Sequence, residues 1–252
     1  MKIVVIGGTG LIGSQVVTFL TEQGHEAVAA SPASGVDTMT GQGLPAALDG
    51  AAVVVDVSNS PSLEDDAAMS FFTTSTRNIL AAETDAGVHH HVALSVVGTR
   101  RLADSGYMRA KVAQEELIES SAIPWSIVHA TQFFEFVQGI ANAATVDGAV
   151  RLAPVLIQPI AAEDVARVVA RTAVEPPTNA IVEVAGPEVF RFDVLIDQAV
   201  RAHGDPRPVA PDRDARYFGA LLDERTLLPD DGALQGTTGF EDWLRRSSNV
   251  AP

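Results

Sequence analysis

The feature that most constrains this chain is a glycine-rich segment that follows its first apolar run. Residues 2–7 (KIVVIG) have the continuous apolar character of a strand buried on both faces of a parallel sheet. They lead into Gly7-Gly8-Thr9-Gly10-Leu11-Ile12-Gly13, and a helical pattern then runs to about Gln23. Glycines here allow a tight turn, close approach of the backbone to a pyrophosphate, and contact between helix and strand. Because a helix N-terminus also offers free N–H groups to anions, the segment predicts a dinucleotide-binding loop formed by Gly7, Gly10, Leu11, Ile12 and Gly13.

Strand and helix patterns alternate through the first half of the chain. Apolar runs predict further strands at 26–31, 52–58, 92–96, 126–130 and 180–185, and helical patterns fall at 65–86, 106–121 and 163–174. This alternation predicts an α/β fold of Rossmann type, a doubly wound parallel sheet in one domain over residues 1–252. The second half is less regular, with helices expected near 193–203 and 240–245. We expect a small C-terminal substrate lobe from segments at about 133–158 and 187–252.

Charge and composition exclude several classes of partner. The chain has 252 residues, a formal net charge of −15 and no cysteine. An acidic field repels phosphate backbones and anionic lipid, so we expect no nucleic-acid or membrane partner. Without cysteine there is no disulfide, thiolate metal site or cysteine nucleophile. The first residues show no secretory signal, and we expect a soluble, cytoplasmic protein. His89-His90-His91 predicts no metal site, because consecutive strand residues face alternate sides.

The end of the second predicted strand bears on the choice between NAD and NADP. An NAD site uses Asp or Glu there to bind the ribose 2′-hydroxyl, whereas this chain has Ser31-Pro32-Ala33-Ser34. Ser31 and Ser34 can donate hydrogen bonds to a 2′-phosphate, although no Arg is present to clamp it. The pattern favours NADP, with NAD as the alternative. Asp37, expected after a short third strand, is a candidate acceptor for the adenine amino group.

Tyr107 and Lys111 stand four residues apart at the start of a predicted helix and share one face of it. The chain has only two tyrosines and two lysines, so chance rarely produces this spacing. A ketone that accepts a hydride needs a proton on its oxygen, and a nearby ammonium would lower the pKa of a tyrosine toward neutrality. Ser95 ends the preceding strand, where its hydroxyl can hold the reacting oxygen beside Tyr107. We predict Ser95, Tyr107 and Lys111 as the catalytic residues.

Taken together, the glycine loop, Ser95 and Tyr107-Met-Arg-Ala-Lys111 resemble the short-chain dehydrogenase/reductase superfamily. The segments Asn78-Ile79-Leu80-Ala81-Ala82, Ser95-Val96-Val97-Gly98 and Ile160-Ala161-Ala162-Glu163-Asp164-Val165-Ala166 resemble its atypical NmrA-like branch. The resemblance covers about residues 1–190. It implies a Rossmann fold, NAD(P) binding with Lys111 on the ribose, and conversion of a carbonyl/alcohol pair. It also implies that Asn59 and Ser60 border the ribose and nicotinamide, and that Thr131, Gln132, Phe133 and Phe134 border the substrate.

Two functions from different classes fit these features. The first is an NAD(P)H-dependent reductase of a carbonyl or quinone-like, fairly apolar small molecule, with Tyr107 as proton donor. The second is a non-catalytic regulator that senses NADP(H), since several NmrA-like proteins lack the tyrosine; it gives no reason to keep Ser95, Tyr107 and Lys111 together. A nucleotide-sugar epimerase or dehydratase needs polar contacts, whereas 131–136 and 152–157 are apolar. Homodimer formation is a further expectation, based on the frequency of twofold oligomers alone.

Overall fold

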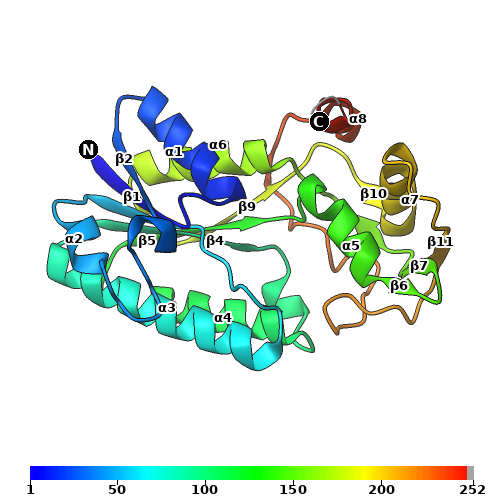
Figure 1. The fold of residues 1–252 in the computed structure, drawn as a ribbon, viewed down its shortest axis with the longest axis horizontal. Helices are drawn as coiled ribbons and strands as arrows, with labels where there is room; N and C mark the ends of the chain where they lie inside the picture. The colour runs from blue at the N-terminus through cyan, green and yellow to red at the C-terminus, as the bar shows by residue number, and fades with distance from the viewer. Residues whose placement is uncertain (249–252) are drawn as a thin grey trace.

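The computed structural model describes residues 1–248, which are arranged around a seven-stranded parallel sheet (Figure 1). In chain order the strands are β1 (Lys2–Ile6), β2 (Glu26–Ala30), β3 (Val53–Asp56), β4 (His90–Val96), β5 (Trp125–Ala130), β9 (Ile181–Ala185) and β12 (Leu234–Gln235). Their order in the sheet is β12-β9-β5-β4-β3-β1-β2. The progression reverses beside β1, so the crevice in which α/β proteins bind ligands opens at the carboxyl ends of β1 and β3. The predicted fold class is confirmed.

Helices cover both faces of this sheet because most side chains of its central strands are apolar and buried (Figure 1). One face carries α1 (Leu11–Glu22) and α6 (Ala162–Val174), which pack against each other. The other face carries α2 (Leu44–Leu48), α3 (Asp65–Ala86) and α4 (Gly106–Glu119). The 65–86 prediction agrees with α3, and the pattern expected at 106–121 ends two residues earlier, at Glu119.

A smaller group of elements lies beyond the carboxyl ends of the strands (Figure 1). Its helices are α5 (Val137–Ala143) and α7 (Phe192–Ala202), and its short strands are β6 (Thr145–Val146), β7 (Ala149–Leu152), β8 (Leu156–Ile157), β10 (Phe190–Arg191) and β11 (Val209–Pro211). These elements share one apolar core, in which Phe134 and Phe192 are almost fully buried. The last helix, α8 (Phe240–Ser248), is anchored by Trp243, whose indole N–H donates to Glu135 Oε1 at 3.0 Å.

Local details differ from the predictions at three places. The second strand ends at Ala30, so Ser31 lies outside it, and the strand expected before Asp37 is instead a 3-10 turn, η1 (Pro32–Ser34). Pro32 begins this turn, because its fixed φ suits a helical start. The third strand ends at Asp56 rather than at residue 58. These shorter strands leave more loop at the edge of the sheet.

The histidine run contributes to the core. His91 Nδ1 lies 2.7 Å from Glu83 Oε1, with both side chains fully buried, and His90 Nε2 lies 2.9 Å from Ser126 Oγ. Burial lowers the pKa of His90 to about 4, so its imidazole is neutral at physiological pH. Within residues 1–248, no helix is both long and apolar enough to cross a bilayer.

Candidate active site

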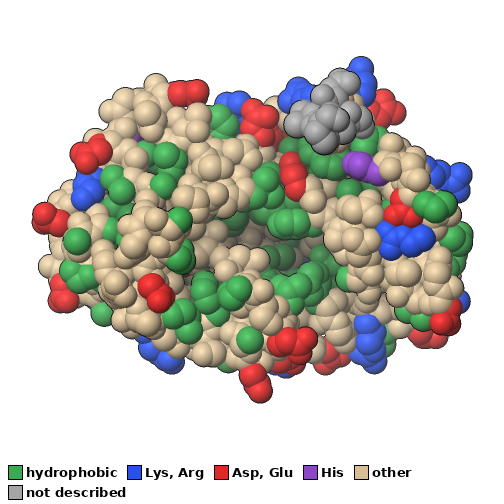
Figure 2. Space-filling model, in the orientation of Figure 1, with side chains coloured by type: hydrophobic (Ala, Val, Ile, Leu, Met, Phe, Trp, Pro, Cys, Tyr) green, Lys and Arg blue, Asp and Glu red, His purple; other side chains and the backbone are tan. Residues whose placement is uncertain are grey.

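A cavity of about 1130 Å³ opens where the sheet meets the smaller group of elements. Figure 2 shows it as a hollow in the middle of the molecule with apolar side chains around it. It extends from the glycine loop past the ends of β3, β4 and β5 to α5. Single-ligand pockets usually measure about 300–1,000 Å³, so this volume suits a cofactor together with a second small molecule.

The glycine loop has the close packing that a pyrophosphate cradle requires. Gly7 has φ +78°, and a Cβ on Gly13 would lie 2.2 Å from the Gly7 carbonyl oxygen. Helix α1 begins after Gly10 with no side-chain cap and no acidic residue in its first turn. Its first N–H groups are therefore available to an anion, and Gly7, Gly10, Leu11 and Ile12 line the cavity. These residues fit a dinucleotide.

The next part of the cavity holds the residues expected near the adenosine ribose. Ser31 is 6% exposed, and in the described part of the chain its hydroxyl has no hydrogen-bond partner. An unpartnered buried hydroxyl is costly unless a ligand satisfies it. Ser34 is placed differently: its hydroxyl is engaged by the backbone of Ser31, and it is not among the lining residues. Asp37 lines the cavity while Oδ1 accepts from the amide of Met39 at 2.8 Å.

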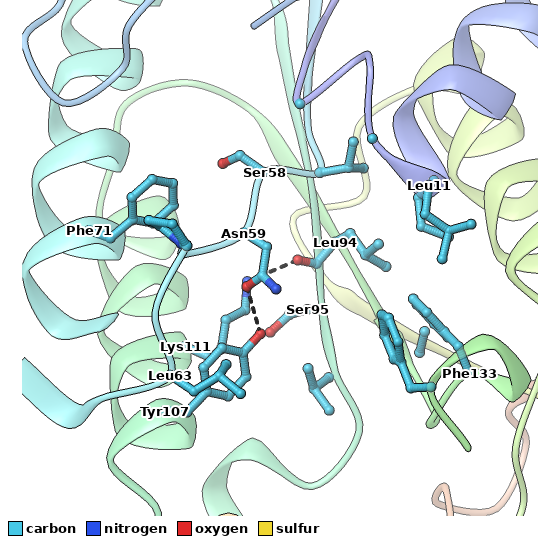
Figure 3. A pocket seen from close by; sticks show the side chains of 18 of the residues that line it. Leu11, Ser58, Asn59, Leu63, Phe71, Leu94, Ser95, Tyr107, Lys111 and Phe133 are labelled. Carbon is cyan, nitrogen blue, oxygen red and sulfur yellow. Dashed lines mark hydrogen bonds between the residues drawn. The ribbon is translucent and has the colours of Figure 1, made fainter. Parts of the chain in front are cut away.

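Tyr107 projects from the start of α4 into the cavity (Figure 3). Its hydroxyl donates to Asn59 Oδ1 at 3.0 Å, and its ring stacks on Phe218 with centroids 5.8 Å apart. Burial raises the pKa of Tyr107 to about 12, the reverse of the predicted lowering. The phenol is therefore protonated at neutral pH. Ser60 lies behind Asn59, where its hydroxyl donates to Ser62 O at 2.6 Å, and it does not line the cavity.

The position of the Lys111 amine explains why its charge does not lower the pKa of Tyr107. Its amine donates to Leu94 O at 3.0 Å and to Gln114 Oε1, and it lies 4.4 Å from the centroid of Phe72. Gln114 in turn donates to Asp56 Oδ2 at 3.1 Å. The amine is thus held in the helix–sheet interface, where burial lowers the pKa of Lys111 to about 8 although Asp56 and Glu115 oppose this. Lys111 still lines the cavity with Tyr107.

We expect Lys111→Met to raise stability at neutral pH. An unfolded chain keeps the Lys111 proton up to its ordinary pKa of 10.5, whereas the fold releases it near 8, so the free energy of unfolding rises with pH between these values. The variant lacks this rise. Its advantage over the parent should shrink by about 2 kcal/mol between pH 8 and 10. Urea denaturation at both pH values measures it; a constant difference would contradict the lowered pKa.

Ser95 is bonded to residues that the sequence reasoning missed. Its hydroxyl donates to Glu115 Oε1 at 2.5 Å, and His129 Nε2 lies 3.0 Å from the same oxygen. Burial opposes ionisation of Glu115, but the nearby His129 imidazole, the Ser95 hydroxyl and the charge of Lys111 hold the pKa of this carboxyl below its usual value. Two sequence signals point to this cluster: Tyr107, Lys111 and Glu115 repeat every four residues on α4, and Glu115 is one of several acidic side chains there.

The residues expected at the substrate separate into two groups. Thr131, Gln132 and Phe133 line the cavity, and Phe133 stacks on Phe136 with centroids 5.3 Å apart. Among the described residues, the amide of Gln132 has no hydrogen-bond partner. Phe134 points away from the cavity into the smaller core, 5.4 Å from the ring of Phe240, and is fully buried. Phe134 is therefore a packing residue.

Fold and loop geometry together define a dinucleotide-binding α/β protein. Residues 7–176 match the NAD(P)H-binding family, and because this match covers well over half of the chain, the protein belongs to that family. The family assignment confirms the predicted cofactor class, NAD(P). No curated protein matches this sequence.

Solved structures share the fold at low sequence identity. A dTDP-4-dehydrorhamnose reductase ortholog from Clostridium acetobutylicum is 16% identical over 99% of each chain, with a TM-score of 0.73. The UDP-glucose 4-epimerase of Thermus thermophilus, solved with NAD, is 18% identical over 97% of each chain, with a TM-score of 0.72. A dTDP-4-dehydrorhamnose reductase from Bacillus anthracis, solved with NADP, is 14% identical over 99% of each chain, with a TM-score of 0.70. At these identities the likeness shows the architecture alone.

Proposed function

We propose that this protein is an NAD(P)H-dependent oxidoreductase that reduces the carbonyl of a small, fairly apolar molecule. The observation that carries the proposal is the position of the Tyr107 hydroxyl, which lies in the same cavity as the glycine loop (Figure 3). Its raised pKa keeps the phenol protonated, the form that a proton donor requires. The bound cofactor would supply the hydride, and Tyr107 would give its proton to the substrate oxygen.

The walls of the cavity favour an aromatic or quinone-like substrate. Tyr107 and Phe218 form one stacked pair and Phe133 and Phe136 another, and all four line the cavity. Aromatic faces bind flat rings through offset or edge contacts. Some of the solved structures with this fold are nucleotide-sugar enzymes. Such an enzyme needs polar groups to bind a sugar diphosphate, and the walls of this cavity offer few.

For the cofactor we propose NADP rather than NAD, on the basis of Ser31. Its buried hydroxyl has no partner in residues 1–248, and no carboxylate ends β2 to accept from a ribose 2′-hydroxyl or to repel a 2′-phosphate. We expect Ser31→Asp to weaken NADPH binding at least about tenfold while leaving NADH binding within about twofold, since the new carboxylate opposes only the extra phosphate. Quenching of reduced-nicotinamide fluorescence measures both.

Ser34→Asp is the matched control for this substitution. It places the same charge three residues away, on an exposed side chain outside the cavity. If Ser34→Asp weakens NADPH binding as much as Ser31→Asp, the 2′-phosphate site does not lie at Ser31. If neither variant distinguishes NADPH from NADH, the preference for NADP is wrong.

The test of the proposed function is consumption of reduced nicotinamide. Purified protein would be mixed with NADPH or NADH and a panel of aromatic ketones, aldehydes and quinones, and the absorbance of the reduced cofactor followed. Oxidation that depends on both substrate and Tyr107 would support the reductase. Tight cofactor binding without turnover across the panel would favour the alternative, a regulator that senses NADP(H) and contacts another protein.

A further inference from the structure

Ser95, Glu115 and His129 form a buried polar cluster beside the cavity. Ser95 and His129 are paired in register on the neighbouring strands β4 and β5, and Glu115 reaches them from α4. Glu115 is 1% exposed, Ser95 4% and His129 6%. The hydroxyl of Thr99 also points at this carboxylate, 3.5 Å from Oε2. Of Ser95, Glu115 and His129, only Ser95 lines the cavity.

The direction of the Ser95 hydrogen bond follows from the chemistry of its partner. An ionised carboxylate accepts hydrogen bonds and cannot donate them, so at 2.5 Å the proton between Ser95 and Glu115 belongs to Ser95. The imidazole of His129, 3.0 Å from the same oxygen, stabilises the carboxylate form. A serine hydroxyl has one proton and two lone pairs. With the proton committed to Glu115, Ser95 has only lone pairs to offer the cavity.

We propose that Glu115 is a positioning residue that turns Ser95 into a hydrogen-bond acceptor, so that the site selects substrates carrying a hydroxyl beside the carbonyl to be reduced. This rests on the proposed function, because it takes the cavity to be the substrate site. The carbonyl oxygen would accept from the phenol of Tyr107, whose proton would turn from the neutral, solvent-accessible oxygen of Asn59. The neighbouring hydroxyl would donate to Ser95. Ser95 and Tyr107 both lie on this part of the wall (Figure 3). A simple ketone would instead present lone pairs to the lone pairs of Ser95. The substrate class is thus an aromatic hydroxycarbonyl compound.

The experiment compares two ligands in which a methyl group replaces the hydrogen of the hydroxyl. α-Hydroxyacetophenone can donate to Ser95, whereas α-methoxyacetophenone cannot. Their dissociation constants would be measured by calorimetry in the presence of oxidised NADP, which has no hydride to give to either carbonyl. Constant absorbance at the reduced-nicotinamide band would verify that the alcohol of the hydroxy ligand is not oxidised. We expect the hydroxy ligand to bind about tenfold more tightly to the parent protein, the value of one hydrogen bond that replaces an unfavourable contact. Ser95→Ala should abolish the preference.

Glu115→Met frees the Ser95 proton and should reduce the preference to less than about threefold, because a free hydroxyl can donate to the oxygen of either ligand. Simple loss of structure would weaken both ligands together and leave their ratio unchanged. Glu115→Gln keeps the shape of the side chain if the methionine variant does not fold, and it should reduce the preference to less than about threefold, because a neutral amide can donate as well as accept. Glu116→Met, on the exposed side of the same helix, is the matched control.

A parent protein without preference for the hydroxy ligand, or a preference that survives Ser95→Ala or Glu115→Met, would overturn the inference. Because binding is measured in a complex that does not turn over, this result is independent of catalysis. Absence of any reductase activity with a preserved hydroxyl preference would leave the role of Glu115 intact and refute the proposed function instead.

Discussion

Tyr107→Phe should lower turnover by about 10²–10⁴-fold while changing NADPH affinity by less than about twofold. The substitution removes the phenol oxygen that would protonate the substrate, but it keeps the ring, which stacks on Phe218 and meets Phe72 edge-on at 5.8 Å. Within residues 1–248, the hydroxyl donates one hydrogen bond, to Asn59, in a region open to the cavity. Steady-state kinetics with the best substrate of the panel, together with fluorescence titration of NADPH, separates the two effects.

Tyr217→Phe is the matched control, since it removes the other phenol hydroxyl of the chain. Tyr217 also lines the cavity, and its ring packs on Phe218 at 4.7 Å and on Phe192 at 5.8 Å. We expect it to lose less than about fivefold in turnover. Full activity of Tyr107→Phe with normal cofactor binding would rule out Tyr107 as proton donor. Equal losses of turnover in both variants would indicate that the two hydroxyls support the shape of the pocket and that Tyr107 has no separate role as proton donor.

Gly13→Ala should weaken NADPH binding by more than about 100-fold, which corresponds to roughly 2.7 kcal/mol. A Cβ at this position would lie 2.2 Å from Gly7 O and 2.7 Å from Gly8 Cα, so the backbone of the loop itself must move. The free N–H groups of Leu11 and Ile12 at the start of α1 would then lose their alignment toward the pyrophosphate. Fluorescence titration of NADPH measures the affinity, and circular dichroism verifies that the α/β fold persists.

Gly139→Ala makes the same change in another helix, α5, and an added Cβ there meets no atom within 4 Å. Alanine also has the better helix propensity, so this variant should be at least as stable as the parent. Unimpaired NADPH binding by Gly13→Ala would mean that the loop does not hold the pyrophosphate. An equal loss in Gly139→Ala would mean that the assay reports general damage.

Sequence reasoning predicted the parts of the site that depend on neighbours in the chain. The loop at Gly7–Gly13, the strand that carries Ser95 and the helical spacing of Tyr107 and Lys111 are all local patterns. Sequence reasoning could not predict which atoms these side chains contact in the folded protein. Lys111 was expected to act on Tyr107, but the packing of α3 and α4 turns its amine toward Gln114 and Asp56. Such contacts are set by helix packing rather than by spacing along one element.

The same limit applies to Phe134 and to the Glu115 cluster. Phe133 and Phe134 are adjacent and identical residues, and nothing local distinguishes Phe133, at the cavity, from Phe134, in the core. The 3-10 turn η3 (Phe134–Phe136) sends these neighbours in different directions. His129 lies beside Ser95 only because β4 and β5 pair in one particular register, and Glu115 reaches both from α4. Register between distant strands is a tertiary property, and the sequence contains no local sign of it.

The path of the chain around the cavity has a consequence for how ligands are recognised. After β5 the chain enters the smaller group of elements, returns to the sheet for α6 and β9, leaves again for β10, α7 and β11, and comes back for β12. Connections that cross in both directions oppose the hinge bending by which two separate lobes close on a ligand. We therefore expect a pre-organised cavity that loses little conformational entropy when it fills. Selectivity in such a pocket resides in its fixed shape, so changes of substrate preference should come from single side chains on the wall rather than from altered domain motion.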